Sequence, residues 1–157
     1  MEINIRDWKS SDSEKVLQSW LAFCRTAARS DMRLKPDCER VMRQWLASRI
    51  KEPNSLGFIA EIDGVWAGFV IGRIDEWEST PPVLEPRRLG IIDAVYVSDE
   101  FRRSGIGARL VEHALQAMRA RNAIAAETIY DAWSDASSAL WRQAGFAPWM
   151  VHAYRTL

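Results

Sequence analysis

The stretch from Asp93 to Gln116 constrains the fold of this chain more than any other. β-forming residues fill its beginning and the two positions before it, which predicts a strand ending at Val97. Apolar residues then recur at helical spacing from Ile106 to Met118. Between them lies a short polar turn with Gly105 and Gly107, where the backbone can approach a ligand closely and the first N–H groups of the helix point outward. The stretch therefore predicts a strand–turn–helix unit that binds an anion, most naturally a phosphate or pyrophosphate.

Two common phosphate-binding loops do not fit this turn. A Walker loop needs a Lys-Ser/Thr pair after its last glycine, where this chain has Ala108-Arg109. The dinucleotide-binding motif needs a third small residue, and Leu110 occupies that place. What remains is Arg102-x-x-Gly105-x-Gly107-Ala108, which closely resembles the acetyl-CoA motif of the GCN5-related N-acetyltransferase (GNAT) family. The alternative is an ordinary strand–helix connection whose glycines only relieve backbone strain.

The resemblance implies an acetyl-CoA site made of three segments. In the family, the loop amides hold the CoA pyrophosphate, the end of the preceding strand pairs with the pantetheine arm, and a later Asn-x-x-Ala-x-x-Leu-Tyr-x-x-x-Gly-Phe segment lies near the sulfur. That last segment corresponds to Ser134–Phe146, with Ser134 in place of the asparagine and Trp141 in place of the tyrosine. The implied cofactor-binding residues are Val95, Tyr96, Val97, Arg102, Arg103, Ser104, Gly105, Ile106, Gly107, Ala108, Ser134 and Trp141.

Length and composition limit the classes of protein to which this chain can belong. At 157 residues, with 48% hydrophobic and 27% charged residues, the chain is predicted to form one globular domain over residues 1–157. Its 21 basic and 21 acidic residues give no bulk charge for binding nucleic acid or an anionic membrane. We find no signal peptide or membrane span, and Cys24 and Cys38 are too few for a disulfide framework, so a cytoplasmic protein is expected. No Cys/His cluster has metal-ligand spacing, so no metal is expected.

The order of predicted elements extends the resemblance over nearly the whole chain. Ser11 and Glu14 have the spacing of a capping box for the first helix, and Asp63-Gly64 predicts a hairpin turn. The resemblance implies an α/β (α+β) fold with a mixed, splayed six- to seven-stranded sheet and about four helices. About eleven residues follow Gly145-Phe146, so a seventh strand would be shortened, absent or supplied by a partner in a homodimer. The predicted strands are 3–5, 56–62, 65–74, 91–97, 123–130 and 146–156, and the helices are 11–29, 36–50, 106–118 and 137–144.

Acetyl transfer by direct attack in a ternary complex needs a base for the amine and a proton for the leaving thiolate. The candidate bases are Asp93, Glu127 and Asp131; alternatively, each pairs with an arginine or stays solvated. The family uses a tyrosine as the acid, and the indole N–H of Trp141 cannot replace it near neutral pH. Trp141 then either shapes the sulfur pocket or only packs its helix. Tyr130 is the preferred acid, with Tyr96, Tyr154 and water as alternatives.

The acceptor is the least determined part of the prediction. In the family, the walls of the site that binds the acetyl acceptor come from the first two helices, the loop between them and the segment before the central strand. An acidic, aromatic rim there could attract a cationic amine, or it is simply a solvated loop. The sequence thus predicts an N-acetyltransferase that uses acetyl-CoA and a small-molecule or peptide amine, with a non-catalytic acyl-CoA-binding or interaction module as the alternative. The rim residues are Arg25, Arg29, Asp31 and Arg33 on one side and Asp75, Glu76, Trp77 and Glu78 on the other.

Overall fold

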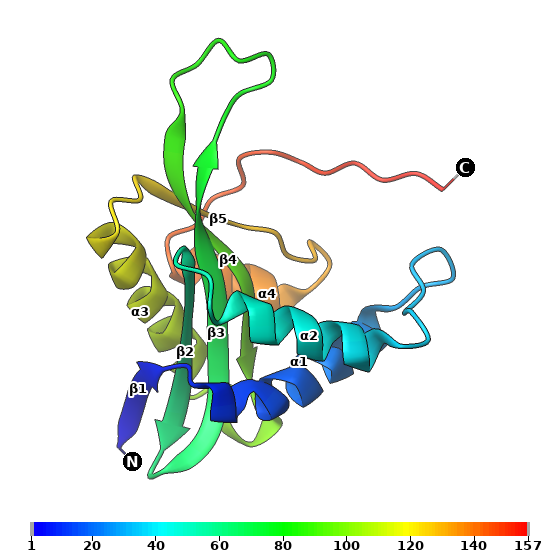
Figure 1. Cartoon of the computed structure of the whole chain (residues 1–157), viewed down its shortest axis with the longest axis vertical. Helices are drawn as coiled ribbons and strands as arrows, with labels where there is room; N and C mark the ends of the chain where they lie inside the picture. Colours follow the sequence, from blue (N-terminus) through cyan, green and yellow to red (C-terminus); the bar gives the residue numbers. More distant parts are fainter. Residues whose placement is uncertain (1, 157) are drawn as a thin grey trace.

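The computed structural model describes residues 2–156 and shows a twisted sheet with helices on both faces (Figure 1). The five strands lie in the order β1-β2-β3-β4-β5. Helices α1 and α2 cover one face, and α3 and α4 cover the other. The strands are β1 (Ile3–Asp7), β2 (Ser55–Ile62), β3 (Val65–Trp77), β4 (Arg87–Val97) and β5 (Ala125–Thr128), and the helices are α1 (Ser13–Ala27), α2 (Cys38–Arg49), α3 (Ile106–Ala120) and α4 (Asp135–Gln143).

The pairing of the strands is antiparallel from β1 to β4, and β5 runs parallel to β4. The turn between β2 and β3 is the predicted two-residue hairpin turn, because Asp63 and Gly64 both have positive φ, at 48° and 80°. Gly145 has the left-handed conformation after α4, with φ 83°, which is common for a glycine that ends a helix. Among the described residues, no helix is long and apolar enough to cross a membrane.

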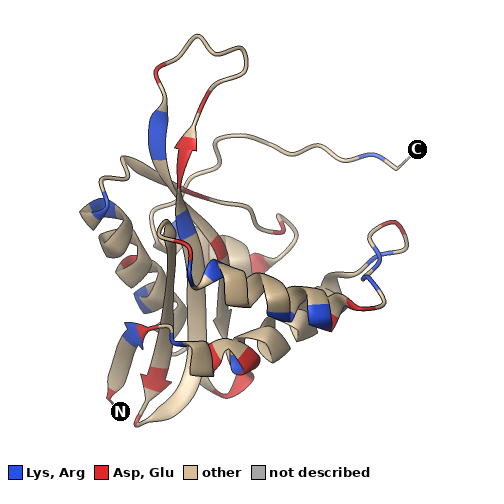
Figure 2. Cartoon of the chain, viewed as in Figure 1, with Lys and Arg blue, Asp and Glu red and all other residues tan. Residues whose placement is uncertain are grey.

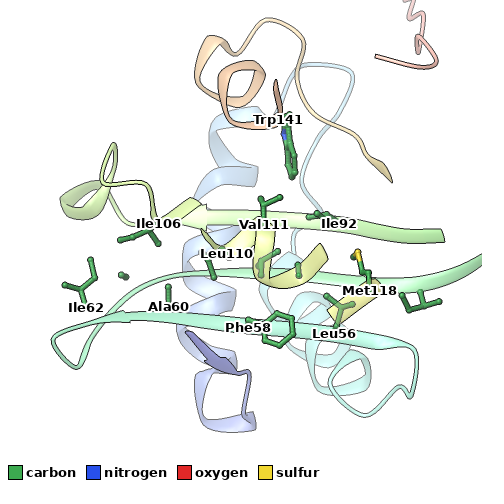
Figure 3. Close-up of a cluster of buried hydrophobic side chains, with 14 residues drawn as sticks. Leu56, Phe58, Ala60, Ile62, Ile92, Ile106, Leu110, Val111, Met118 and Trp141 are labelled. Atoms are coloured by element: carbon green, nitrogen blue, oxygen red, sulfur yellow. The ribbon is translucent and has the colours of Figure 1, made fainter. Parts of the chain in front are cut away.

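Two apolar cores hold the helices to the sheet. The α3-side core joins Leu110, Val111 and Met118 to β2 and β4, and also takes Trp141 from α4 (Figure 3). The α1/α2-side core joins Leu17 and Leu46 to the opposite face of the sheet. The helical and alternating apolar spacings in the sequence correspond to these two interfaces.

The predicted strand over 146–156 is not formed, so the sheet has five strands rather than six or seven. An alternating sequence becomes a strand only when a neighbouring edge supplies hydrogen-bond partners. None of residues 147–156 makes a backbone–backbone hydrogen bond to another described residue. The segment instead runs extended away from the sheet (Figure 1).

Three local predictions are also corrected. The strands predicted over 65–74 and 91–97 are too short, because β3 and β4 pair as far as Trp77 and Arg87 and form a protruding arm. The capping box is not made by Ser11 and Glu14, since α1 begins at Ser13 and the Asp12 carboxylate accepts the Lys9 N–H at 2.9 Å. Within the predicted helix 36–50, the apolar spacing places Trp45 on the inward face, but its side chain is 38% exposed.

Candidate functional site

An opening lies between β4 and β5. The two strands pair only from Leu89 to Ile92 on β4 and from Ala125 to Thr128 on β5. The Thr128 hydroxyl donates to the Ile92 carbonyl at 3.2 Å, at the last paired position. From there to Val97, β4 is paired only with β3 among the described residues. This unpaired edge carries Val95, Tyr96 and Val97 and can pair with the backbone-like amides of an extended ligand.

A β-bulge at Asp93 accompanies the opening. Ile71 pairs with Ala94 and Gly72 pairs with Ile92, which leaves Asp93 without an opposite residue on β3. The bulge reverses the alternation of β4, so that Val95 and Ile92 both belong to the α3-side core, whereas Tyr96 packs in the α1/α2-side core. Sequence reasoning missed this bulge, because β-forming residues lie on both sides of Asp93 and local spacing does not show which residue is left unpaired.

The turn after β4 presents the start of α3 to solvent. Gly105 is the N-cap of α3 and has φ 82°, and no side chain caps the helix. The first N–H groups of α3, on Ile106, Gly107 and Ala108, have no acceptor within their own helix and are free to bind an anion. A methyl group at Gly107 would lie 3.4 Å from Leu140 Cδ1, which is ordinary contact. Of the two glycines in this turn, only Gly105 therefore has a backbone conformation that favours glycine in the protein without a ligand.

Arginine and serine side chains surround this turn. Arg102 is exposed and pairs with Asp99 at 2.7 Å, and its Nε donates to the Val97 carbonyl at 3.4 Å. Arg103 is exposed and has φ 64°, and the Ser104 hydroxyl donates to the Phe101 carbonyl. The turn thus combines free N–H groups with two cations, which suits a pyrophosphate.

The three candidate carboxylates have different surroundings. Glu127 Oε1 is buried and has no hydrogen-bond partner among the described residues. Asp93 accepts from Arg73 and lies 3.7 Å from Arg49 Nη2. Asp131 is exposed and accepts the Trp133 N–H at 2.9 Å. Asp93 Oδ2 is also buried without a hydrogen bond, but it pairs with Arg49, so among the described residues Glu127 is the candidate whose buried oxygen has neither a hydrogen bond nor an ion pair.

Glu127 faces the side of the sheet covered by α1 and α2. Its neighbour Ala126 packs in the α3-side core, and successive strand residues point to opposite faces. Glu127 pairs with Ile91, one position before the end of the β4–β5 pairing. The carboxylate thus lies near the end of the β4–β5 pairing, on the face covered by α1 and α2.

The sheet separates Tyr96 from Tyr130 and Trp141. Trp141 is 5% exposed and packs against Phe146, with a centroid distance of 5.1 Å, and against Tyr130, at 6.2 Å. Tyr96 stacks on Phe69 in the opposite core. Tyr154 lies in the extended C-terminal segment and donates to Asp31. Ser134 caps α4, since its hydroxyl accepts the Ser137 N–H at 3.3 Å.

The predicted acidic rim is largely paired with arginines. Glu76 pairs with Arg88, Asp75 lies 3.8 Å from Arg73, and Asp31 lies 3.7 Å from Arg29. The helix α2 itself carries three arginines, Arg40, Arg43 and Arg49, and one acidic residue, Glu39 (Figure 2). No cluster of three or more potential metal ligands occurs in the described part of the chain.

Comparison with known proteins agrees with this geometry. The sequence model of the Acetyltransferase (GNAT) family matches residues 15–146. An uncharacterized N-acetyltransferase from Archaeoglobus fulgidus is 40% identical over 84 residues, which are 54% of this chain and 52% of the relative. The match thus spans about half the length of that curated relative.

Solved structures share the fold over almost the entire chain. The aminoglycoside antibiotic 6'-N-acetyltransferase AAC(6')-IG from Acinetobacter haemolyticus superposes with a TM-score of 0.75 at 18% identity, covering 98% of this chain and 97% of that protein. AAC(6')-Iy, solved with the bisubstrate analog CoA-S-monomethyl-acetylneamine, has a TM-score of 0.73 at 17% identity and covers 100% and 99%. Because the family model matches most of the sequence, the chain belongs to the GNAT family of acetyltransferases.

Proposed function

We propose that this chain, as one domain over residues 1–157, transfers the acetyl group of acetyl-CoA to a primary amine. One observation carries the proposal: the unpaired edge of β4 leads directly to the uncapped N-terminus of α3. An extended pantetheine arm can pair with Val95–Val97, and a pyrophosphate can accept from the N–H groups of Ile106, Gly107 and Ala108. The residues present therefore suit CoA at both ends of its arm.

The chemical step follows from holding both substrates at the opening. The amine nitrogen attacks the thioester carbonyl carbon, and the C–S bond breaks to release the CoA thiolate. A backbone N–H near Tyr96 or Val97 donates to the thioester oxygen as negative charge develops there. The proton lost by the amine goes to Glu127, whose buried oxygen has no other partner among the described residues.

Other residues are less suited to the two proton transfers. Asp93 is held by Arg73 beside Arg49, and Asp131 is exposed. For the thiolate, Tyr130 is favoured over Tyr154, because Tyr154 is bound to Asp31 on the distant α1–α2 loop. Tyr130 packs against Trp141, which is a core residue on the α3 side. Trp141 then acts by positioning Tyr130 rather than by donating a proton itself.

The test is CoA release from acetyl-CoA with a panel of small amines and peptide N-termini. Glu127→Gln should slow turnover by about 10²–10⁴-fold while acetyl-CoA affinity, measured by calorimetry, stays the same. Asp131→Asn is the matched control on the same segment and should remain active. Binding of acetyl-CoA without release of CoA by the wild type, for every amine, would instead indicate a non-catalytic acyl-CoA-binding module. Full activity in Glu127→Gln would show that Glu127 is not the general base.

A further inference from the structure

The C-terminal segment 147–156, which we call the strap, is held at two points by side chains. It leaves the end of α4 and runs toward the loop between α1 and α2 (Figure 1). No backbone–backbone hydrogen bond joins it to another described residue, so its position depends on these two side-chain anchors.

The first anchor is aromatic. The Arg87 guanidinium lies 4.3 Å from the Trp77 ring centroid and 4.7 Å from that of Trp149, and the two rings are 6.4 Å apart. Arginine over tryptophan is a favourable cation–π arrangement. The contact fixes the start of the strap to the base of the β3–β4 arm.

This anchor lies on the same face of the sheet as Glu127. A Cβ at Gly90 would meet Met118 of α3, which places Gly90 on the α3 side of β4. Arg87 lies three positions before Gly90 on β4, and the pairing of β4 with β3 is regular between the two residues. Because successive strand residues alternate, positions 87 and 90 point to opposite faces of the sheet. Arg87 therefore projects to the face covered by α1 and α2, where Glu127 also points.

The second anchor joins the strap to the α1–α2 loop. The Tyr154 hydroxyl donates to Asp31 Oδ2, and the Thr156 hydroxyl donates to the same oxygen at 3.3 Å. Arg29 lies 5.4 Å from the Tyr154 ring centroid and 3.7 Å from the Asp31 carboxylate. The strap thus connects the two sides of the rim that the family resemblance assigns to the acceptor.

The strap and α2 are of similar length. Trp149 and Tyr154 are five positions apart, about 17 Å in an extended chain. The twelve residues of α2 span about 18 Å. The end of α2 lies over the same sheet face, since Arg49 is 3.7 Å from Asp93. The strap, at Arg87, and α2, at Arg49, thus both reach the sheet face that holds the candidate base.

Apolar side chains are exposed on both borders. Met150 and Val151, between the two anchors, are 62% and 89% exposed, and Trp45 on α2 is stacked on Arg49 with 38% of its surface exposed. Exposed apolar side chains gathered around one site favour a ligand with apolar surface. We propose that the strap is the acceptor-side wall opposite α2 and selects a primary amine carried on an apolar body. This inference rests on the proposed acetyltransferase function.

The kinetic test compares two amines, phenethylamine as the apolar probe and the polycationic amino sugar sisomicin. The wild type should prefer phenethylamine. Trp149→Ala, which removes one ring of the first anchor, should lower kcat/KM for phenethylamine by about 10-fold and leave the KM for acetyl-CoA unchanged. Val65→Ala is the control, since Val65 is 54% exposed at the β2–β3 turn, and it should change neither value. Preference for sisomicin, or unchanged phenethylamine kinetics in Trp149→Ala, would overturn the proposal.

A second measurement does not depend on turnover. With CoA present, phenethylamine should slow chymotryptic cleavage of the strap at Trp149 and Tyr154, whereas sisomicin should not. Absence of this protection would overturn the strap's role even if the chain acetylates other amines. Protection by phenethylamine, without release of CoA from acetyl-CoA in the presence of any amine, would instead support the strap as a wall of the acceptor site and contradict the acetyltransferase function.

Discussion

The ion pair between Arg6 and Asp12 should contribute strongly to the stability of the fold. Asp12 is 7% exposed, and its carboxylate accepts from Arg6 Nη1 at 2.8 Å, from Arg6 Nη2 at 2.9 Å and from the Lys9 N–H at 2.9 Å. Arg6 also donates to Glu61 Oε1, at 2.9 and 2.7 Å. The pair thus ties β1 to the start of α1 and to β2.

Asp12→Asn keeps the shape of the side chain and removes its charge. Breaking a buried pair costs about 3–5 kcal/mol when the remaining charge has no partner. Glu61 still compensates Arg6, so we expect a loss of about 2 kcal/mol. For a chain of this size that corresponds to a fall in Tm of about 4–8 °C. Urea unfolding should show a lower midpoint with an unchanged m-value.

The effect should depend on pH with a definite sign. The hydrogen bonds from Arg6, more than that from Lys9, lower the pKa of Asp12 below its ordinary value, against the opposing effect of burial. The stabilisation is therefore complete above the unfolded-state pKa and is lost as the pH falls through the folded-state pKa. The difference between wild type and Asp12→Asn should be full at pH 7 and shrink below about pH 4. Equal stability of the two proteins at pH 7 would refute the reasoning.

Three further substitutions test the loop and the sheet. Gly107→Ala should fold normally but bind CoA more weakly in calorimetry; unchanged affinity would argue against a pyrophosphate at α3. Arg102→Ala should raise the dissociation constant for CoA several-fold, about 1 kcal/mol, and more at low salt; no change at low salt would leave backbone N–H groups as the sole contacts. Gly90→Ala places a Cβ 2.2 Å from Met118 Sδ, so thermal unfolding should show a loss of about 1–3 kcal/mol; unchanged stability would contradict tight packing of Met118 on β4.

The sequence predicted those parts of the fold that depend on local periodicity. The strands up to β4 and the helix α3 follow from alternating and helical apolar spacing, and the turn at Asp63-Gly64 follows from the preference of that pair for hairpin turns. The strand predicted for 146–156 failed because a strand also needs a partner edge, which local spacing does not encode.

The candidate site was predictable only in part, for the same reason. The motif around Gly105 predicted the turn between β4 and α3, but the state of each carboxylate depends on residues far away in the chain. Asp93 is bound by Arg73 and lies beside Arg49, which come from β3 and α2. The isolation of Glu127 Oε1 depends on burial between elements. Sequence reasoning could therefore name these carboxylates as candidates but could not choose between them.

The most direct test of the central claim is amide hydrogen exchange with and without CoA. The account predicts that CoA slows exchange at the first turn of α3, Ile106–Ala108, and along the unpaired edge of β4, Val95–Val97, while the β1–β2 pairing is unaffected. Protection confined to other segments, or none at saturating CoA, would contradict the assignment of this opening as the acetyl-CoA site.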